Sequence, residues 1–165
     1  MKRFFAFLTL PILLVAGIFL SLPKLIIPQY SPMLLDQNGE ILCVQLSPDE
    51  KWRLAIPWEQ VPLSYLKMLV TYEDKRFYQH PGVDPIALSR ALWQWMKNGQ
   101  IISGGSTLTM QTVRLLNPRP RTLFYKLEEI FQALWLECRY SKKEILSLYM
   151  TLAPYGGNIE GLRAA

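Results

Sequence analysis

Cysteine and histidine are scarce in this chain of 165 residues, which contains two cysteines and one histidine. Cys43 and Cys138 lack the spacing of a disulfide framework or a zinc site, so we predict no disulfide and no metal site made from them. The sequence also has no internal repeat, no low-complexity tract and no long basic run, although its formal net charge is +5. The length allows one ordinary domain and argues against two complete ones.

Charge is absent from one long apolar segment near the N-terminus. Residues 4–23 contain no charged side chain, and as a helix they would span about 30 Å, the thickness of a bilayer core. Lys2 and Arg3 precede this segment, which predicts that residues 1–24 form a cytoplasmic tip and a transmembrane signal anchor. A cleaved signal peptide is the alternative, but no small-x-small cleavage site follows the segment. The rest of the chain is then exported, so nucleic acid is not the expected partner. The basic residues are expected to bind anionic lipid head groups or a phosphate-bearing substrate.

Short strands are predicted between the anchor and residue 57. Residues 33–36 and 41–44 flank an Asn38-Gly39 pair, which is a strong hairpin signal. A further strand is expected at 52–56. We therefore predict a small β linker over residues 25–57.

From Trp58 onward the apolar residues recur at helical spacing, which predicts a mainly α-helical domain over residues 58–165. Caps, prolines and periodicity predict five helices, which begin near residues 62, 85, 107, 123 and 142. The first, second, third and fifth are expected to end near residues 76, 98, 117 and 153. The fourth helix carries an apolar face made of Leu123, Leu127, Ile130, Phe131 and Leu134.

Glu73 continues the apolar stripe of the first helix, seven residues after Leu66 and four before Phe77. A carboxylate that faces an apolar interior has its charged form disfavoured, which suits a general base. The alternative is an ion pair with a basic residue near the helix end, and periodicity alone favours it. His80 is a lone histidine, which more often braces a loop or orients a neighbour such as Asp74 than it shuttles protons.

A glycine-rich junction, Gly104-Gly105-Ser106-Thr107, precedes the third helix. Glycines let backbone approach a ligand closely, and a helix N-terminus offers free N–H groups to an anion. Gln111 and Arg114 follow at spacings that bring a hydroxyl, an amide and a guanidinium to one side of the helix. This pattern is typical of a phosphate-binding pocket. The alternative is a plain glycine turn with a serine or threonine cap.

Lys126 and Glu129 lie three residues apart on the flank of the fourth helix's apolar face. A cation and a carboxylate at that spacing are usually a surface ion pair. If this flank faces a cleft, Lys126 holds a phosphate, and Glu129 steadies the lysine or positions a proton.

Three ordered segments resemble the motifs of glycosyltransferase family 51, namely EDKRFYQHPGVD, GGSTLTMQTVR and KLEEIFQALWLECRYSKKEILSLYM. This domain occurs in class A penicillin-binding proteins and in monofunctional transglycosylases. The strings ISGGSTLTMQ, RLLNPRPRT and LAPYGGNIEGLRAA are most similar to the 1C type of penicillin-binding protein. The resemblance covers about residues 25–165. It implies a lysozyme-like helical lobe with a membrane-facing jaw, and an enzyme that polymerises lipid II into peptidoglycan.

The resemblance implies a role for each matching residue. Glu73 matches the general base, which takes the proton from the sugar 4-hydroxyl of the acceptor lipid II. That oxygen attacks the anomeric carbon of the lipid-linked donor with inversion, forms a β-1,4 bond and releases undecaprenyl pyrophosphate. Glu129 matches a second acidic residue that helps the leaving group or a divalent ion. The implied substrate-binding residues are Asp74, His80, Gly105, Ser106, Thr107, Gln111, Arg114 and Lys126.

The resemblance also implies partners and a location. Expected partners are lipid II, the growing lipid-linked glycan and the membrane, with other cell-wall synthesis proteins as candidates. No cofactor is required, and Mg²⁺ or Mn²⁺ is a candidate divalent cation. We expect a single-pass protein of the bacterial inner membrane, with its catalytic part on the periplasmic or outer side.

The sequence departs from the family pattern at several positions, among them Tyr125, where arginine is common, and Thr151, where asparagine is common. It ends at Ala165, within what looks like the next motif, so we expect the last part of the domain to be missing. Two alternatives follow. One is a catalytically idle membrane module that binds lipid II or wall-synthesis proteins. The other is a lytic muramidase, which would need neither the glycine-rich pocket nor Lys126.

Overall fold

The structure, a computed structural model, describes residues 17, 25–100 and 104–165. This part of the chain is mainly α-helical, as predicted, and none of its helices is long and apolar enough to cross a membrane. The anchor predicted at residues 1–24 lies outside the described residues except for Gly17. The α-helices are α2 (Leu63–Glu73), α3 (Pro85–Asn98), α4 (Leu108–Leu116), α5 (Leu123–Arg139) and α6 (Lys142–Leu152), and single 3₁₀ turns lie at Trp58–Gln60 and Phe77–Gln79.

Local sequence signals set the ends of these helices. The Asp84 carboxylate caps α3 by accepting two backbone N–H groups, and Pro85 follows at the first helical position, where its missing N–H costs nothing. Gly99 ends α3 with φ +68°, a conformation that glycine adopts readily. Ser141 and Glu144 form a reciprocal capping box at the start of α6.

Two small sheets complete the fold. The hairpin predicted around Asn38-Gly39 is confirmed, with Met33 opposite Val44. The third strand of the linker, predicted at 52–56, covers only Trp52–Arg53. It pairs in parallel with a strand near the C-terminus, so the linker and the C-terminal segment share one sheet. The strands are β1 (Met33–Leu35), β2 (Ile41–Val44), β3 (Trp52–Arg53), β4 (Pro154–Gly156) and β5 (Ile159–Glu160), in the spatial orders β1-β2 and β3-β5-β4.

A buried arginine reinforces this second sheet. The Arg53 side chain is 3% exposed and donates to Glu160 (Nε to Oε2, 2.7 Å), to Asp49 (Nη2 to Oδ2, 2.7 Å) and to the carbonyl of Gln29 (2.7 Å). The charged hydrogen bond from Arg53 lowers the pKa of Asp49 to about 2 against the opposing effect of burial. These bonds satisfy a guanidinium that would be costly to bury alone.

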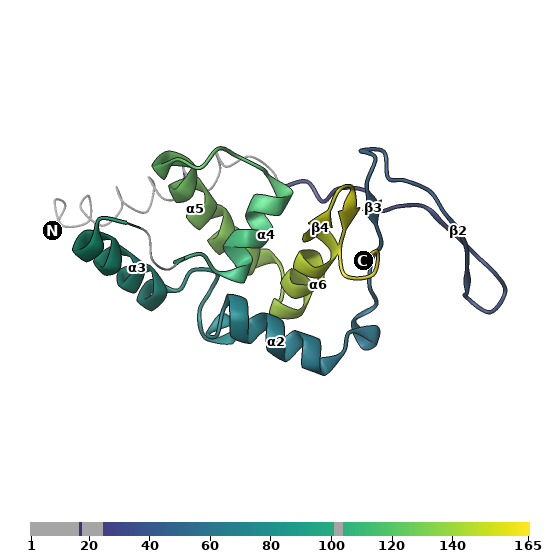
Figure 1. The fold of residues 1–165 in the computed structure, drawn as a ribbon, viewed down its shortest axis with the longest axis horizontal. Helices are drawn as coiled ribbons and strands as arrows, with labels where there is room; N and C mark the ends of the chain where they lie inside the picture. The colour runs from purple at the N-terminus through teal and green to yellow at the C-terminus, as the bar shows by residue number, and fades with distance from the viewer. Residues whose placement is uncertain (1–16, 18–24, 101–103) are drawn as a thin grey trace, which may run out of the picture.

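Helix α4 lies at the centre of the helical core, where it packs against both α5 and α6 (Figure 1). Its side chains Leu108, Met110 and Val113 are buried, together with two threonines. Thr112 donates to the carbonyl of Leu108, and Thr109 donates to Glu137 of α5. A short helix with apolar residues around so much of its surface is stable only inside a core, which makes α4 a rigid base for side chains at its remaining face.

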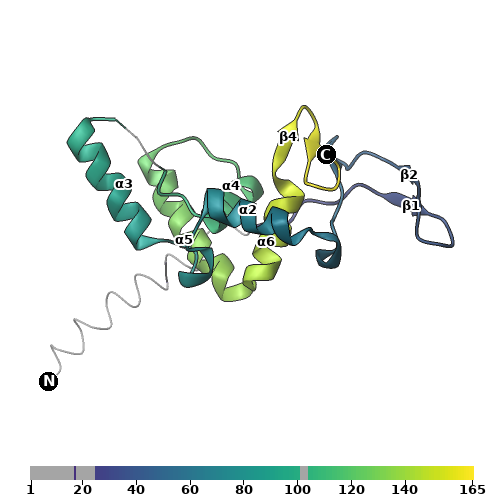
Figure 2. The same ribbon diagram turned by 60° about the horizontal axis from the view of Figure 1, so that its bottom comes forward.

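Helix α3 and the first turns of α5 are much more exposed. No residue of α3 is buried, and the helix stands away from α4 and α6 in both views (Figure 1 and Figure 2). The predicted apolar face of α5 contains Leu123 and Leu127, whose side chains are 88% and 58% exposed. The buried face of α5 is instead Gln132, Ala133 and Leu136, farther along the helix.

Candidate active site

Glu73 is the last residue of α2, three residues before the predicted end of that helix. The expectation that it continues a buried apolar stripe is wrong, because Glu73 is exposed and its neighbour Asp74 is buried. The Glu73 carboxylate accepts a hydrogen bond from Gln111 of α4 (Nε2 to Oε2, 2.9 Å). Tyr149 of α6 donates in turn to Gln111 Oε1 (3.4 Å), and burial together with the charge of Glu73 raises the pKa of that tyrosine.

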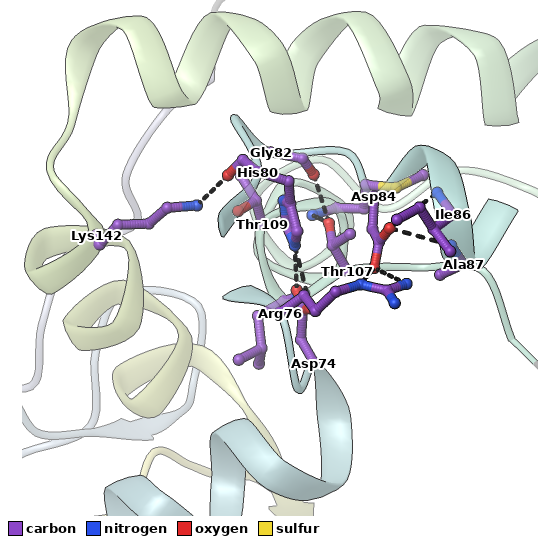
Figure 3. A network of polar contacts seen from close by, with 12 residues as sticks. Asp74, Arg76, His80, Gly82, Asp84, Ile86, Ala87, Thr107, Thr109 and Lys142 are labelled. Carbon is purple, nitrogen blue, oxygen red and sulfur yellow. Dashed lines mark hydrogen bonds and ion pairs between the residues drawn. The ribbon is translucent and has the colours of Figure 1, made fainter. Parts of the chain in front are cut away.

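Asp74 joins the end of α2 to the start of α4. It accepts from His80 (Nε2 to Oδ1, 3.1 Å) and from the backbone N–H of Leu108 (N to Oδ2, 3.0 Å). Figure 3 shows this contact with His80, whose carbonyl also accepts from Lys142. Asp74 and His80 are both 7% exposed. The interpretation of His80 as a residue that orients Asp74 agrees with this geometry, and substrate contact by either residue stays a prediction.

The same network extends to Arg76 and Asp84 (Figure 3). Potential metal-ligating atoms of Asp74, His80 and Asp84 lie within 4.8 Å of one another. However, Arg76 donates to Asp84 Oδ2 (2.8 Å), and Asp84 Oδ1 accepts the two N–H groups of the α3 cap. Burial opposes ionisation of Asp84, but these bonds outweigh it and lower its pKa. Because a guanidinium already supplies the positive charge, the cluster does not fit a metal ion.

The glycine-rich junction is packed tightly between α3 and α4. A Cβ atom at Gly105 would lie 3.3 Å from the Leu88 Cα of α3, so the missing side chain permits this approach. The backbone of Ser106 continues to Thr107, which is the N-cap of α4 and accepts from Met110 N. The buried Thr107 hydroxyl donates to the carbonyl of Gly82. Thr107 thus positions the loop, and its contact with substrate stays a prediction.

Two cations, one from the last turn of α4 and one from the first turn of α5, converge on a single carboxylate oxygen. Lys126 Nζ lies 2.9 Å from Glu129 Oε1 and donates to Ser106 Oγ at 2.7 Å. Arg114 Nη2 lies 3.1 Å from the same Glu129 oxygen. Burial lowers the pKa of Lys126, Glu129 opposes this, and the like charge of Arg114 adds to it. We call Ser106, Arg114, Lys126 and Glu129 the cationic cluster, since it carries one net positive charge.

The cationic cluster lines a cavity of about 480 Å³ between the glycine-rich junction, α4 and the start of α5. Of the residues that the sequence predicted for this pocket, Thr107 and Gln111 do not line the cavity. The others do, namely Gly105, Ser106, Arg114, Lys126 and Glu129. Residues that the prediction missed also line it, namely Asn117, Arg119, Pro120, Arg121, Thr122, Glu128 and Gln132. The signal for the two arginines was their alternation with proline directly before the cap of α5.

Glu73 does not line this cavity, and α4 connects the two places. Gln111, which holds Glu73, is three residues before Arg114 of the cationic cluster. That spacing is just under one helical turn, about 4.5 Å along the axis, and it brings both residues to one side of α4. The arrangement therefore has two parts, an accessible carboxylate with an amide partner and an anion-attracting cavity beside it.

Comparison with known proteins adds an independent finding. The family described as Transglycosylase matches residues 38–165. Penicillin-binding protein 1C of Escherichia coli is 46% identical over 129 residues, which are 78% of this chain and 17% of that protein. Penicillin-binding protein 1B of Haemophilus influenzae is 40% identical over 118 residues, 71% of this chain and 15% of that protein. Penicillin-binding protein 1A of Escherichia coli is 38% identical over 118 residues, 70% of this chain and 14% of that protein. The chain thus spans less than a fifth of the length of these curated relatives.

Proposed function

This chain belongs to the transglycosylase family, glycosyltransferase family 51, and from that premise we propose that it polymerises lipid II into β-1,4-linked peptidoglycan strands. One observation carries the proposal. Gln111, which binds Glu73, and Arg114 of the cationic cluster are three residues apart on α4. A sugar transfer with a diphosphate leaving group requires a base and an anion-binding site close to one another.

Glu73 acts in this proposal as the general base. Gln111 occupies Oε2 of the carboxylate, so Oε1 is the atom that takes the proton from the 4-hydroxyl of the acceptor sugar. The oxygen attacks the anomeric carbon of the donor, and the bond from that carbon to the diphosphate breaks with inversion. Exposure of Glu73 allows the acceptor to approach, since a base must come within hydrogen-bond reach of the proton that it removes.

The cationic cluster holds the departing undecaprenyl pyrophosphate. Ser106 Oγ accepts from Lys126, which leaves its O–H to donate to a phosphate oxygen. Arg114 and Lys126 share one carboxylate oxygen, and a preorganised positive charge of this kind stabilises the negative charge that develops on a leaving group. Glu129 keeps the two cations in place. No resident cofactor is needed, and Mg²⁺ or Mn²⁺ is a candidate counter-ion of the diphosphate.

The exposed apolar side chains suit a substrate that is embedded in a membrane. Trp93 and Trp95 of α3 are 62% and 52% exposed, and Leu123 and Phe124 at the start of α5 are 88% and 72% exposed. Tryptophan prefers the interface between lipid and water because its ring is apolar and its N–H is polar. We propose that these faces form the membrane-facing jaw of a lysozyme-like lobe, anchored by residues 1–24 on the periplasmic side of the inner membrane.

Replacement of the base tests this function. Glu73→Gln should abolish incorporation of labelled lipid II into polymer, because an amide cannot accept the proton, while the variant stays folded. Glu59→Gln is the matched control, since Glu59 is also exposed and its one ion pair among the described residues, at 3.7 Å, is with Lys143. Undiminished polymerisation by Glu73→Gln would discard the proposed base. Tight binding of lipid II without turnover by the unaltered chain would favour an idle binding module, and release of fragments from isolated sacculi would favour a muramidase.

A further inference from the structure

The loop between α4 and α5 presents two arginines in a restrained backbone. Its sequence is Asn117-Pro118-Arg119-Pro120-Arg121-Thr122. Each proline fixes its own φ and restricts the residue before it to extended conformations. The loop closes with a hydrogen bond from the Thr122 N–H to the Pro120 carbonyl (3.0 Å) and leads directly into the α5 cap. The two guanidinium groups are therefore carried by a loop with little freedom to move away.

Arg119 lies over the ring of Tyr125, with 5.9 Å between its guanidinium carbon and the ring centroid. Both residues line the cavity that contains the cationic cluster. Arg119 also borders a neighbouring cavity of about 520 Å³, which Tyr125 does not line. An arginine stacked on a ring keeps the N–H donors around its edge available, and these donors match the oxygens of a phosphate.

The charge of Arg119 is not neutralised by the described part of the chain. No carboxylate there lies within ion-pair distance of Arg119 or Arg121, whereas Arg114 and Lys126 both meet Glu129. The cavity wall contains four cations and two carboxylates, so it carries an excess of two positive charges. An excess of this size in a concave site attracts a multiply charged anion more strongly than a singly charged one.

We propose that Arg119, held over Tyr125, is a further phosphate-binding residue of this cavity and contacts the diphosphate of the lipid-linked substrate. The identity of the substrate rests on the proposed function. The preference for a diphosphate rests on the cavity, where Arg119 faces the anion from the loop and Lys126 and Arg114 face it from the helices. Contacts from two directions hold both phosphates of one ligand.

Titration of the full chain in detergent with inorganic pyrophosphate tests the binding residue directly. Arg119→Ala should weaken binding roughly tenfold, the usual effect of losing one charged hydrogen-bonding partner. Arg139→Ala is the matched control, because Arg139 also stacks on an aromatic ring, that of Trp135 at 5.0 Å, and does not line this cavity. It should bind pyrophosphate like the unaltered chain.

A rescue experiment separates the charge of Arg119 from any effect on folding. Position 125 adjoins Lys126 on the cavity wall, so Tyr125→Arg combined with Arg119→Ala returns a cation to the same wall and should restore most of the affinity for pyrophosphate. Arg119→Ala should also raise the KM for lipid II more than it lowers kcat. Equal pyrophosphate affinity of Arg119→Ala and the unaltered chain would overturn the proposal, as would absence of pyrophosphate binding by the unaltered chain.

The outcomes for lipid II keep this proposal distinct from the proposed function. If the unaltered chain binds pyrophosphate through Arg119 but does not polymerise lipid II, the phosphate site stands and the polymerase function fails. If the chain polymerises lipid II and Arg119→Ala changes neither the KM nor pyrophosphate affinity, the function stands and Arg119 has no part in the site.

Discussion

Asp74 offers the sharpest test of how the fold holds the proposed base in place. Its buried carboxylate accepts from His80 Nε2 and from the Leu108 N–H, and it directly follows Glu73. Asp74→Ala removes the acceptor of both donors. Asp74→Asn removes the charge but keeps an acceptor for Leu108, and its new NH₂ group can donate to His80 Nε2 once the histidine proton moves to Nδ1. The two substitutions therefore separate hydrogen bonding from charge.

The expected magnitudes follow from this count of donors. A buried donor left without an acceptor costs about 1–3 kcal/mol, so Asp74→Ala should lower the free energy of unfolding by about 2–6 kcal/mol. Asp74→Asn exchanges charge-assisted bonds for neutral ones and should cost about 1–2 kcal/mol. His80 Nδ1 is buried and has no hydrogen-bond partner among the described residues. The moved proton therefore leaves one buried donor without an acceptor in Asp74→Asn, against two in Asp74→Ala.

Urea unfolding of the detergent-solubilised chain, followed by tryptophan fluorescence, measures these differences. Asp36→Ala is the control, because Asp36 also accepts backbone N–H groups, those of Asn38 and Glu40, but is exposed to water. It should cost less than about 1 kcal/mol, since water replaces the lost acceptor. If Asp74→Asn is as destabilising as Asp74→Ala, negative charge rather than donor pairing holds the network. If Asp74→Ala costs no more than Asp36→Ala, the argument from buried donors fails.

Two further predictions concern pH. Burial lowers the pKa of Lys126, so the rate of polymerisation should decline as pH rises toward that lowered value. Lys126→Arg should move this decline to higher pH in a pH–rate profile. An unmoved profile would exclude deprotonation of Lys126 as the cause of the decline. The pKa of Asp49 is about 2 when folded, against an ordinary value of 3.8, so its ion pair with Arg53 stabilises the fold above about pH 4 and is lost as pH falls toward 2. Asp49→Asn should show a smaller drop in urea midpoint between pH 5 and pH 2.5 than the unaltered chain, and an equal drop would contradict this linkage.

Some features of the fold and of the site could be predicted from local sequence patterns. The caps of α3 and α6, the hairpin at Asn38-Gly39 and the gathering of Ser106, Arg114 and Lys126 all follow from spacing along one segment or from a recognised motif. The exposure of Glu73 did not follow, because helical periodicity predicts a face and does not say whether another element covers it. Helix α2 ends at Glu73, and the next residue, Asp74, is the one whose side chain is buried.

Motif order and local chemistry in the amino-acid chain were enough to assign the family, the mainly helical class and five residues of the cavity wall. Tertiary packing alone brought Arg119 over Tyr125, joined β3 to β5 across more than a hundred residues, and left Thr107 facing a backbone carbonyl rather than the cavity. The reason is physical. Caps and turns depend on neighbours within a few residues, whereas the direction of a side chain at a site depends on which distant segment occupies the space beside it.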